Sequence, residues 1–86
     1  MPERFTVEKV ALRTESEGPD YFTWGEFQVT DTATGQVVAR FPWTLDETFL
    51  ISPNYSGPDD VRISDDGTAA IATTGGDEVR IALPTD

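Results

Sequence analysis

The chain contains neither cysteine nor histidine. Without cysteine it has no disulfide bridge, no thiolate zinc site and no cysteine nucleophile. Without histidine it lacks the side chain that most often serves as a general base or metal ligand near neutral pH. The two absences argue against an enzyme, and the lack of disulfides favours a cytoplasmic location, or the virion or host cytoplasm if the protein is phage-encoded.

Long apolar runs are also missing. No stretch of about 18 uninterrupted apolar residues occurs, which is the length that a membrane-spanning helix needs. The residues after Met1 are polar and charged and do not resemble the apolar core of a signal peptide. We therefore expect neither a secretion signal nor a membrane span.

Basic residues are few, with six Lys and Arg against sixteen Asp and Glu and a net charge of −10. Such a surface repels nucleic acid phosphates and anionic membranes, so direct binding to either is not expected. Lys9 is the only lysine beside five arginines. A preference for arginine over lysine is typical of salt-loving or high-GC organisms, and on this interpretation the acidic surface keeps the protein solvated. Alternatively, the acidic surface mimics phosphates and docks on a basic protein.

The hydrophobic pattern predicts an all-β protein. Short alternating runs rich in Val, Ile, Thr and aromatic residues recur between turn signals, and helical periodicity is absent. We expect residues 1–86 to form a single small antiparallel domain of six or seven short strands, arranged as a meander, a sandwich or a small open barrel. Trp24 and Trp43 are expected to anchor its core.

Strands are predicted at 5–14, 21–31, 37–45, 61–64, 69–74 and 79–84, with loops at 14–20 and 52–60. Residues 46–51 fit a strand better than a helical turn. The apolar parity changes after Val7, which predicts either a β-bulge near Glu8 and Lys9 or two short strands in place of one. Gly25 indicates a bulge or a close backbone approach, and Pro42 indicates a sheet edge.

The stretch VTDTATGQVV, residues 29–38, predicts a β-hairpin. Asp31 and Thr34 can bond the turn backbone, and Gly35 can supply the positive φ that closes it. A weak internal repeat relates the strand and turn pattern of residues 10–29 to that of residues 61–81.

The segment DDVRISDDGTAAIATTGGDEVRIALP, together with FQVTDTATGQVVARF, resembles the blade pattern of β-propeller repeats, particularly the YVTN and quinoprotein types. The resemblance covers about half of the chain and lies in its turn residues. A closed propeller needs about four to eight blades. The resemblance thus implies either a ring of several chains or, as we favour, a small sandwich or barrel with propeller-blade-like hairpins.

Candidate catalytic and metal-binding groups are weak. The serines have no histidine partner, and Gly75-Gly76 is not followed by the Lys-Ser/Thr of a phosphate-binding loop. Three acidic pairs begin at Asp59, Asp65 and Asp77, but they lack EF-hand spacing and flank turns in which Asp bonds the backbone. We predict no catalytic residue, no metal ligand and no cofactor.

The predicted function is that of a non-enzymatic interaction or assembly module whose partner is another protein, or a second copy bound at the edge strand VRIALP. The alternative is an acidic inhibitor of the phage type, which imitates nucleic acid and docks on a basic nucleic-acid-binding protein. A carbohydrate- or calcium-binding accessory module is less favoured, because Phe41 and Trp43 alternate inward. The candidate contact residues are Asn54, Tyr55, Asp59, Asp60, Asp65, Asp66, Asp77 and Glu78.

Overall fold

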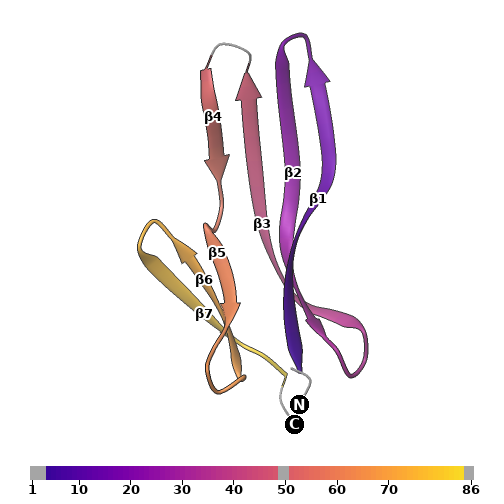
Figure 1. Ribbon diagram of the computed structural model, residues 1–86, viewed down its shortest axis with the longest axis vertical. Helices are drawn as coiled ribbons and strands as arrows, with labels where there is room; N and C mark the ends of the chain where they lie inside the picture. The colour runs from indigo at the N-terminus through magenta and orange to yellow at the C-terminus, as the bar shows by residue number, and fades with distance from the viewer. Residues whose placement is uncertain (1–3, 49–50, 85–86) are drawn as a thin grey trace.

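The computed structural model describes residues 4–48 and 51–84, in which every regular element is an antiparallel strand (Figure 1). The strands are β1 (Phe5–Glu17), β2 (Asp20–Asp31), β3 (Gln36–Thr48), β4 (Ile51–Ser56), β5 (Asp60–Ile63), β6 (Ala69–Thr74) and β7 (Asp77–Ala82). Strands β1 to β4 form a four-stranded sheet, and β5 to β7 form a three-stranded sheet. The prediction of a small all-β fold is confirmed, and the two sheets do not close into a barrel.

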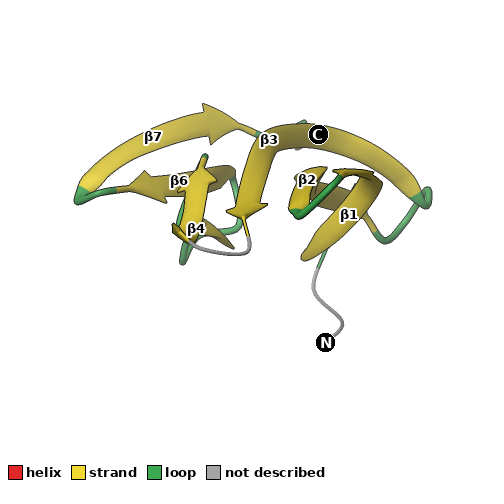
Figure 2. Cartoon of the chain, turned by 90° about the horizontal axis from the view of Figure 1, so that it is seen from above, coloured by secondary structure: helices red, strands yellow, loops and turns green. Residues whose placement is uncertain are grey.

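The described part of the chain has no helix able to cross a membrane. Figure 2, a view along the long axis, shows strands joined by short loops, with β6 and β7 on one side of the molecule and β1 and β2 on the other.

The core lies between the three-stranded sheet and one end of the four-stranded sheet. The longer sheet contributes large side chains from β1, β2 and β3, and the shorter sheet contributes small ones from β5 and β6. The buried cluster consists of Phe5, Phe27, Val29, Phe41, Trp43, Val61, Ala70, Ala72 and Leu83. Large rings on one sheet and small side chains on the other thus form one core.

The other end of the four-stranded sheet projects beyond this core as a single layer (Figure 1). We call residues 12–24, 44–48 and 51–56 the arm. None of the arm residues whose burial is described is buried, and Tyr21 is 53% exposed. The radius of gyration is 15.2 Å, compared with about 12 Å expected for a compact chain of this length. The arm therefore accounts for the elongated shape.

The β2–β3 hairpin closes as its sequence predicts. The Asp31 carboxylate accepts a hydrogen bond from the Ala33 N–H at 2.9 Å, and the Thr34 hydroxyl accepts one from the Gln36 N–H at 3.2 Å. Gly35 has a φ of +76°. The buried Asp31 carboxylate also accepts two bonds from the Arg4 guanidinium, both at 3.2 Å. These bonds, with the Arg4 contribution largest, hold the Asp31 pKa below its ordinary value.

The predicted bulge near Glu8 and Lys9 is wrong, and so is the alternative of two short strands, because β1 runs unbroken from Phe5 to Glu17. The pairing of β1 with β2 is regular there and shifts only between Ala11 and Arg13, which leaves Leu12 as the extra residue. Lys9 takes a core-facing position, with its Nζ 5.0 Å from the Trp43 ring centroid and 4.8 Å from that of Tyr55. A cation over aromatic faces can occupy such a position. Lys9 thus continues the core-facing set of Phe5 and Val7, Val10 lies on the opposite face, and the register shifts only at Leu12.

Two predicted loops are largely strand. The loop expected at 14–20 is a two-residue turn at Gly18 and Pro19, because β1 and β2 stay paired as far as Glu17 and Asp20. The loop expected at 52–60 shortens to 57–59, because β4 runs through it and pairs with β3. Backbone pairing along the arm outweighed the local turn signals. Of the strand expected at 46–51, residues 46–48 and 51 are strand, and Phe49 and Leu50 lie outside the described residues.

Pro42 lies where β3 is paired on one side. Its partner on β2 is Glu26, and pairing with β4 starts only at Thr44 and Ser56. The expected sheet edge is therefore confined to the part of β3 that precedes Thr44. The C-terminal meander of three strands is confirmed.

The internal repeat is not matched by the topology. Its third segment falls at 27–29 in the first copy and at 79–81 in the second. Residues 27–29 belong to β2, the second strand of its sheet, whereas 79–81 belong to β7, the third strand of its sheet. Shared turn residues explain the similarity, because any β-meander uses them.

Gly25 marks a close approach, as predicted. A Cβ at this position would lie 2.2 Å from the Trp43 ring and 2.3 Å from the Val10 carbonyl oxygen. The indole can cover β2 only because this position carries no side chain.

We expect Gly25→Ala to lower the free energy of unfolding by about 2 kcal/mol or more, because neither the buried ring nor the backbone carbonyl can move away. Urea denaturation followed by tryptophan fluorescence measures this change. A loss below about 0.5 kcal/mol would contradict the close packing of Trp43 on β2.

Candidate functional site

Strand β7 is an edge without a neighbour among the described residues. It pairs with β6 on one side, and the sheet order β5-β6-β7 leaves its other side free. Every residue from Asp77 to Ala82 is exposed. A free edge of this kind presents backbone donors and acceptors to any strand that approaches it.

The register shows which backbone groups of β7 point outward. The Leu83 N–H donates to the Thr68 carbonyl oxygen at 2.8 Å, so these two residues form a hydrogen-bonded pair. Hydrogen-bonded and non-hydrogen-bonded pairs alternate along an antiparallel ladder. The β6–β7 register continues without a shift down to Asp77. The backbone groups of Glu78, Arg80 and Ala82 therefore point away from β6.

Two apolar side chains of β7 lie on the core-facing side of its sheet and are not covered. Val79 pairs with Ala72, and Ile81 pairs with Ala70, both of which are buried in the core. Paired residues share a face of the sheet. Val79 is nevertheless 57% exposed and Ile81 40% exposed. The four-stranded sheet thus covers β6 but stops short of β7.

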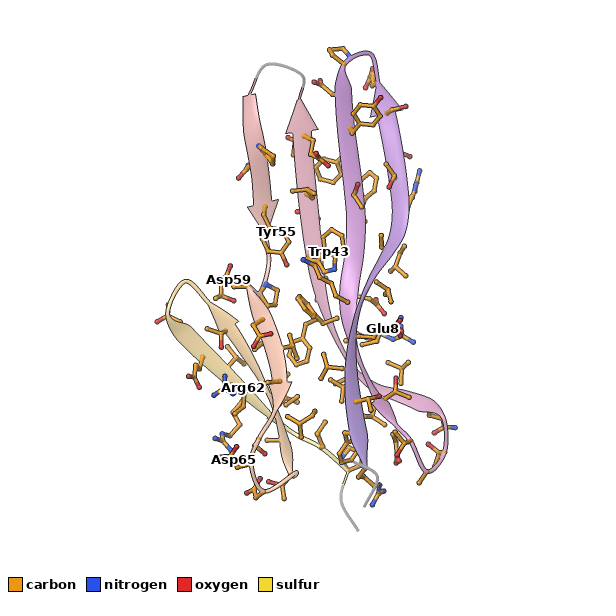
Figure 3. All side chains as sticks on the ribbon, viewed as in Figure 1. Glu8, Trp43, Tyr55, Asp59, Arg62 and Asp65 are labelled. Atoms are coloured by element: carbon orange, nitrogen blue, oxygen red, sulfur yellow. The ribbon has the colours of Figure 1, made fainter. Side chains whose placement is uncertain are left out.

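The opposite face of β7 carries charges of both signs. Glu78 lies 3.6 Å from the Arg62 guanidinium across the sheet, and both side chains are about half exposed. Arg80 pairs with Ile71 and lies beside Asp66 along a shallow depression. Figure 3 shows Arg62 on β5, between Asp59 at one end of the three-stranded sheet and Asp65 at the other.

The arm carries a second feature, a half-buried aromatic pair on the face turned away from the core. The rings of Phe22 and Trp24 are 4.4 Å apart between centroids, and the Arg13 guanidinium lies 5.3 Å from the Trp24 centroid. Trp24 is therefore not a core anchor, in contrast to Trp43. The apolar residues of β2 change parity between Trp24 and Phe27, and this change is the signal that could have placed Trp24 on the second face.

An acidic depression adjoins this aromatic pair. Phe22 forms its apolar part, and four acidic residues line it together with Ser16, namely Glu15, Glu17, Asp20 and Asp46. Glu15 pairs with Arg13. The depression combines an aromatic surface with a local excess of negative charge.

Tyr55 is not the exposed loop residue that the sequence suggested. It lies on β4, half-buried, with its ring stacked on Trp43 at 6.0 Å between centroids (Figure 3). Its hydroxyl donates to the Pro58 carbonyl oxygen at 2.6 Å. Burial, reinforced by the charge of Asp59, raises the pKa of this hydroxyl. The neighbouring prolines and glycine predicted a loop at this position. The strand β4 forms nevertheless, because its backbone pairs with β3.

The other candidate residues do not form one site. Asn54 lies on β4 opposite Asp46, on the sheet face away from Tyr55. The Asp59 carboxylate accepts the Gly75 N–H at 2.9 Å and so ties the start of β5 to the β6–β7 turn. Asp60 is an exposed residue that begins β5.

Asp65 and Asp66 lie at the opposite end of the three-stranded sheet, in the β5–β6 turn. Asp66 accepts hydrogen bonds from the Ser64 hydroxyl at 2.6 Å and from the hydroxyl and N–H of Thr68 at 2.7 and 3.1 Å. These donors, the Ser64 hydroxyl above all, lower the Asp66 pKa to about 2. Its carboxylate thus holds the turn together, whereas Asp65 is exposed beside it.

Only Asp77 and Glu78 of the predicted contact residues fall on the β7 edge. Sequence reasoning identified the strand VRIALP as a free edge but did not select Val79 and Ile81, because their exposure depends on where the other sheet ends.

No family model, no curated protein and no solved structure matches this chain.

The Asp66 carboxylate makes stability depend on pH in the acid range. Its pKa is lowered from the ordinary 3.8 to about 2, so its contribution is complete above about pH 4 and is lost as the pH falls through about 2. We expect the melting temperature of Asp66→Ala to fall less between pH 5 and pH 2 than that of the parent. Thermal unfolding followed by circular dichroism measures this, with Asp65→Ala as the matched control. A parental pH profile in Asp66→Ala would contradict the role of this carboxylate.

Proposed function

We propose that the protein is a non-enzymatic interaction module that binds another protein strand along β7. The observation that carries the proposal is the coincidence, on one free edge, of outward-pointing backbone groups with uncovered Val79 and Ile81. An added strand pairs with these backbone groups and covers these side chains at the same time.

The energetics support strand addition. Each backbone hydrogen bond contributes about 0.5–1.5 kcal/mol net, and covering a side chain such as Val79 adds a hydrophobic contribution. Because β7 is already held in an extended conformation by β6, little of its conformational entropy is lost on binding. Asp59 and Asp66, two acidic residues that could suggest chemistry, are engaged in turns.

Replacing Glu78 with proline tests this proposal without breaking the β6–β7 ladder. Its N–H points outward, so proline removes one outer donor and places a ring at the edge. Glu78→Ala is the matched control, because it removes the same side chain and keeps the N–H. Partners captured with the parent are to be purified and their affinity measured by calorimetry. We expect Glu78→Pro to bind about tenfold more weakly than Glu78→Ala.

Equal affinity of the two variants would remove β7 from the binding surface. Both are expected to unfold at similar temperatures, because the Glu78 side chain is exposed and its one ion pair, with Arg62, is half-exposed.

A second candidate function is docking on a basic protein, as an acidic mimic of nucleic acid would do. It is favoured by the depression on the arm, where four carboxylates surround Phe22. Such binding would be largely electrostatic and would depend steeply on salt.

An oligoarginine peptide is a suitable probe of this second candidate, with tryptophan fluorescence as the signal. We expect the affinity to fall strongly between about 0.15 M and 1 M salt. The double variant Glu17→Gln, Asp20→Asn should bind about threefold more weakly. The control Asp60→Asn, Asp77→Asn removes the same charge elsewhere and should bind like the parent. Equal weakening in both would show that net charge alone attracts the peptide.

A further inference from the structure

We infer that the strand which β7 accepts is the β7 of a second copy, paired antiparallel about a two-fold axis at Val79. The inference rests on the proposed function and names its partner. It follows from three properties of the edge: which backbone groups are free, how the charges alternate, and which apolar side chain lies between them.

The free backbone groups restrict the register. Glu78, Arg80 and Ala82 point outward, as derived above from the Thr68–Leu83 bond. In an antiparallel pair, the residues that exchange hydrogen bonds lie directly opposite each other. Residues that face each other across the new pair must therefore both be outward-pointing, which excludes every register that places Glu78 or Arg80 opposite an odd-numbered residue and leaves only a few.

The charges of β7 select among these registers. With the axis at Val79, Glu78 of each copy faces Arg80 of the other, so two ion pairs form on one face. With the axis at Arg80, two guanidinium groups face each other, and with the axis at Glu78, two carboxylates do. Like charges directly opposite are unfavourable, and opposite charges are favourable.

An axis at Ile81 also places outward-pointing residues opposite each other. It pairs Arg80 with Ala82, however, and forms no ion pair. Glu78 and Arg80 carry one acid and one base on the same face of the sheet, two residues apart. This arrangement makes β7 complementary to itself in one register. Charges of a single sign would instead keep copies apart. Although the whole chain carries a net charge of −10, Glu78 and Arg80 contribute opposite charges to this edge.

The apolar side chain between the charges fits the same register. Val79 of each copy faces Val79 of the other in a non-hydrogen-bonded pair, in which side chains approach most closely. Val79 is the most exposed large apolar residue of the three-stranded sheet, at 57%. Pairing joins the two three-stranded sheets into one continuous sheet and covers this residue from the side.

Disulfide trapping tests the register directly, because the chain has no cysteine of its own. In the inferred pair, the Cα atoms of the two Val79 residues lie about 4.5 Å apart, within the range that a disulfide spans. The two Ile81 residues are offset by about 13 Å along the strands. In a glutathione redox buffer, we expect Val79→Cys to form a covalent dimer about tenfold faster than Ile81→Cys.

A charge exchange tests the same register by a second route, within the Val79→Cys background. Glu78→Arg alone and Arg80→Glu alone each place like charges opposite one another, and each should slow trapping about fivefold. The double exchange Glu78→Arg, Arg80→Glu restores opposite pairs and should restore trapping. Circular dichroism of each variant shows whether the fold is kept.

Faster trapping of Ile81→Cys, equal trapping of the two cysteine variants, or no recovery in the double exchange would overturn the self-pairing. The partner measurement separates failure of the self-pairing from failure of the proposed function. If Val79→Cys does not trap but a purified partner still distinguishes Glu78→Pro from Glu78→Ala, β7 binds a different protein. If neither effect is seen, both proposals fall.

Discussion

The structure depends on the packing of large aromatic rings of one sheet against alanines of the other. Phe27, Phe41 and Trp43 lie on the four-stranded sheet, and Ala70 and Ala72 lie opposite on β6. Small residues on β6 leave room for these rings, and the bare Gly25 lets the Trp43 indole lie against β2. This contact holds together two sheets that share no hydrogen-bonded strand pair in the described residues, so the rest of the fold is arranged around it.

The contact is short because the strands differ in length. Strands β1 and β3 have thirteen residues each, whereas β6 and β7 have six. The shorter sheet therefore covers only one end of the longer one, and the arm remains a single layer. The longer sheet also does not cover β7, where Val79 and Ile81 stay exposed. Both exposed surfaces thus have one cause, the incomplete overlap of the two sheets, and isolated sheets with uncovered apolar groups are the surfaces at which proteins associate.

The two surfaces differ in the partner that they suit. On β7, directional backbone groups and alternating charges favour an extended strand as the proposed partner. On the arm, the Phe22 ring lies among carboxylates, so the attraction proposed there acts at longer range and depends on salt. The β7 edge and the arm both suit the proposed role in binding another chain. For the β7 edge, a second copy of the same chain supplies the complementary strand.

Much of the local structure follows from the sequence by itself. Alternating apolar residues determined the strands, and Asp31, Thr34 and Gly35 determined the β2–β3 turn, because these signals act within a few residues. Lys9 and Tyr55 could not be placed in this way, since one depends on rings from other strands and the other on pairing with β3. Only the tertiary structure decided which apolar residues stay exposed. Burial of Val79 depends on where the other sheet ends, and that boundary arises from the packing of segments far apart in the chain.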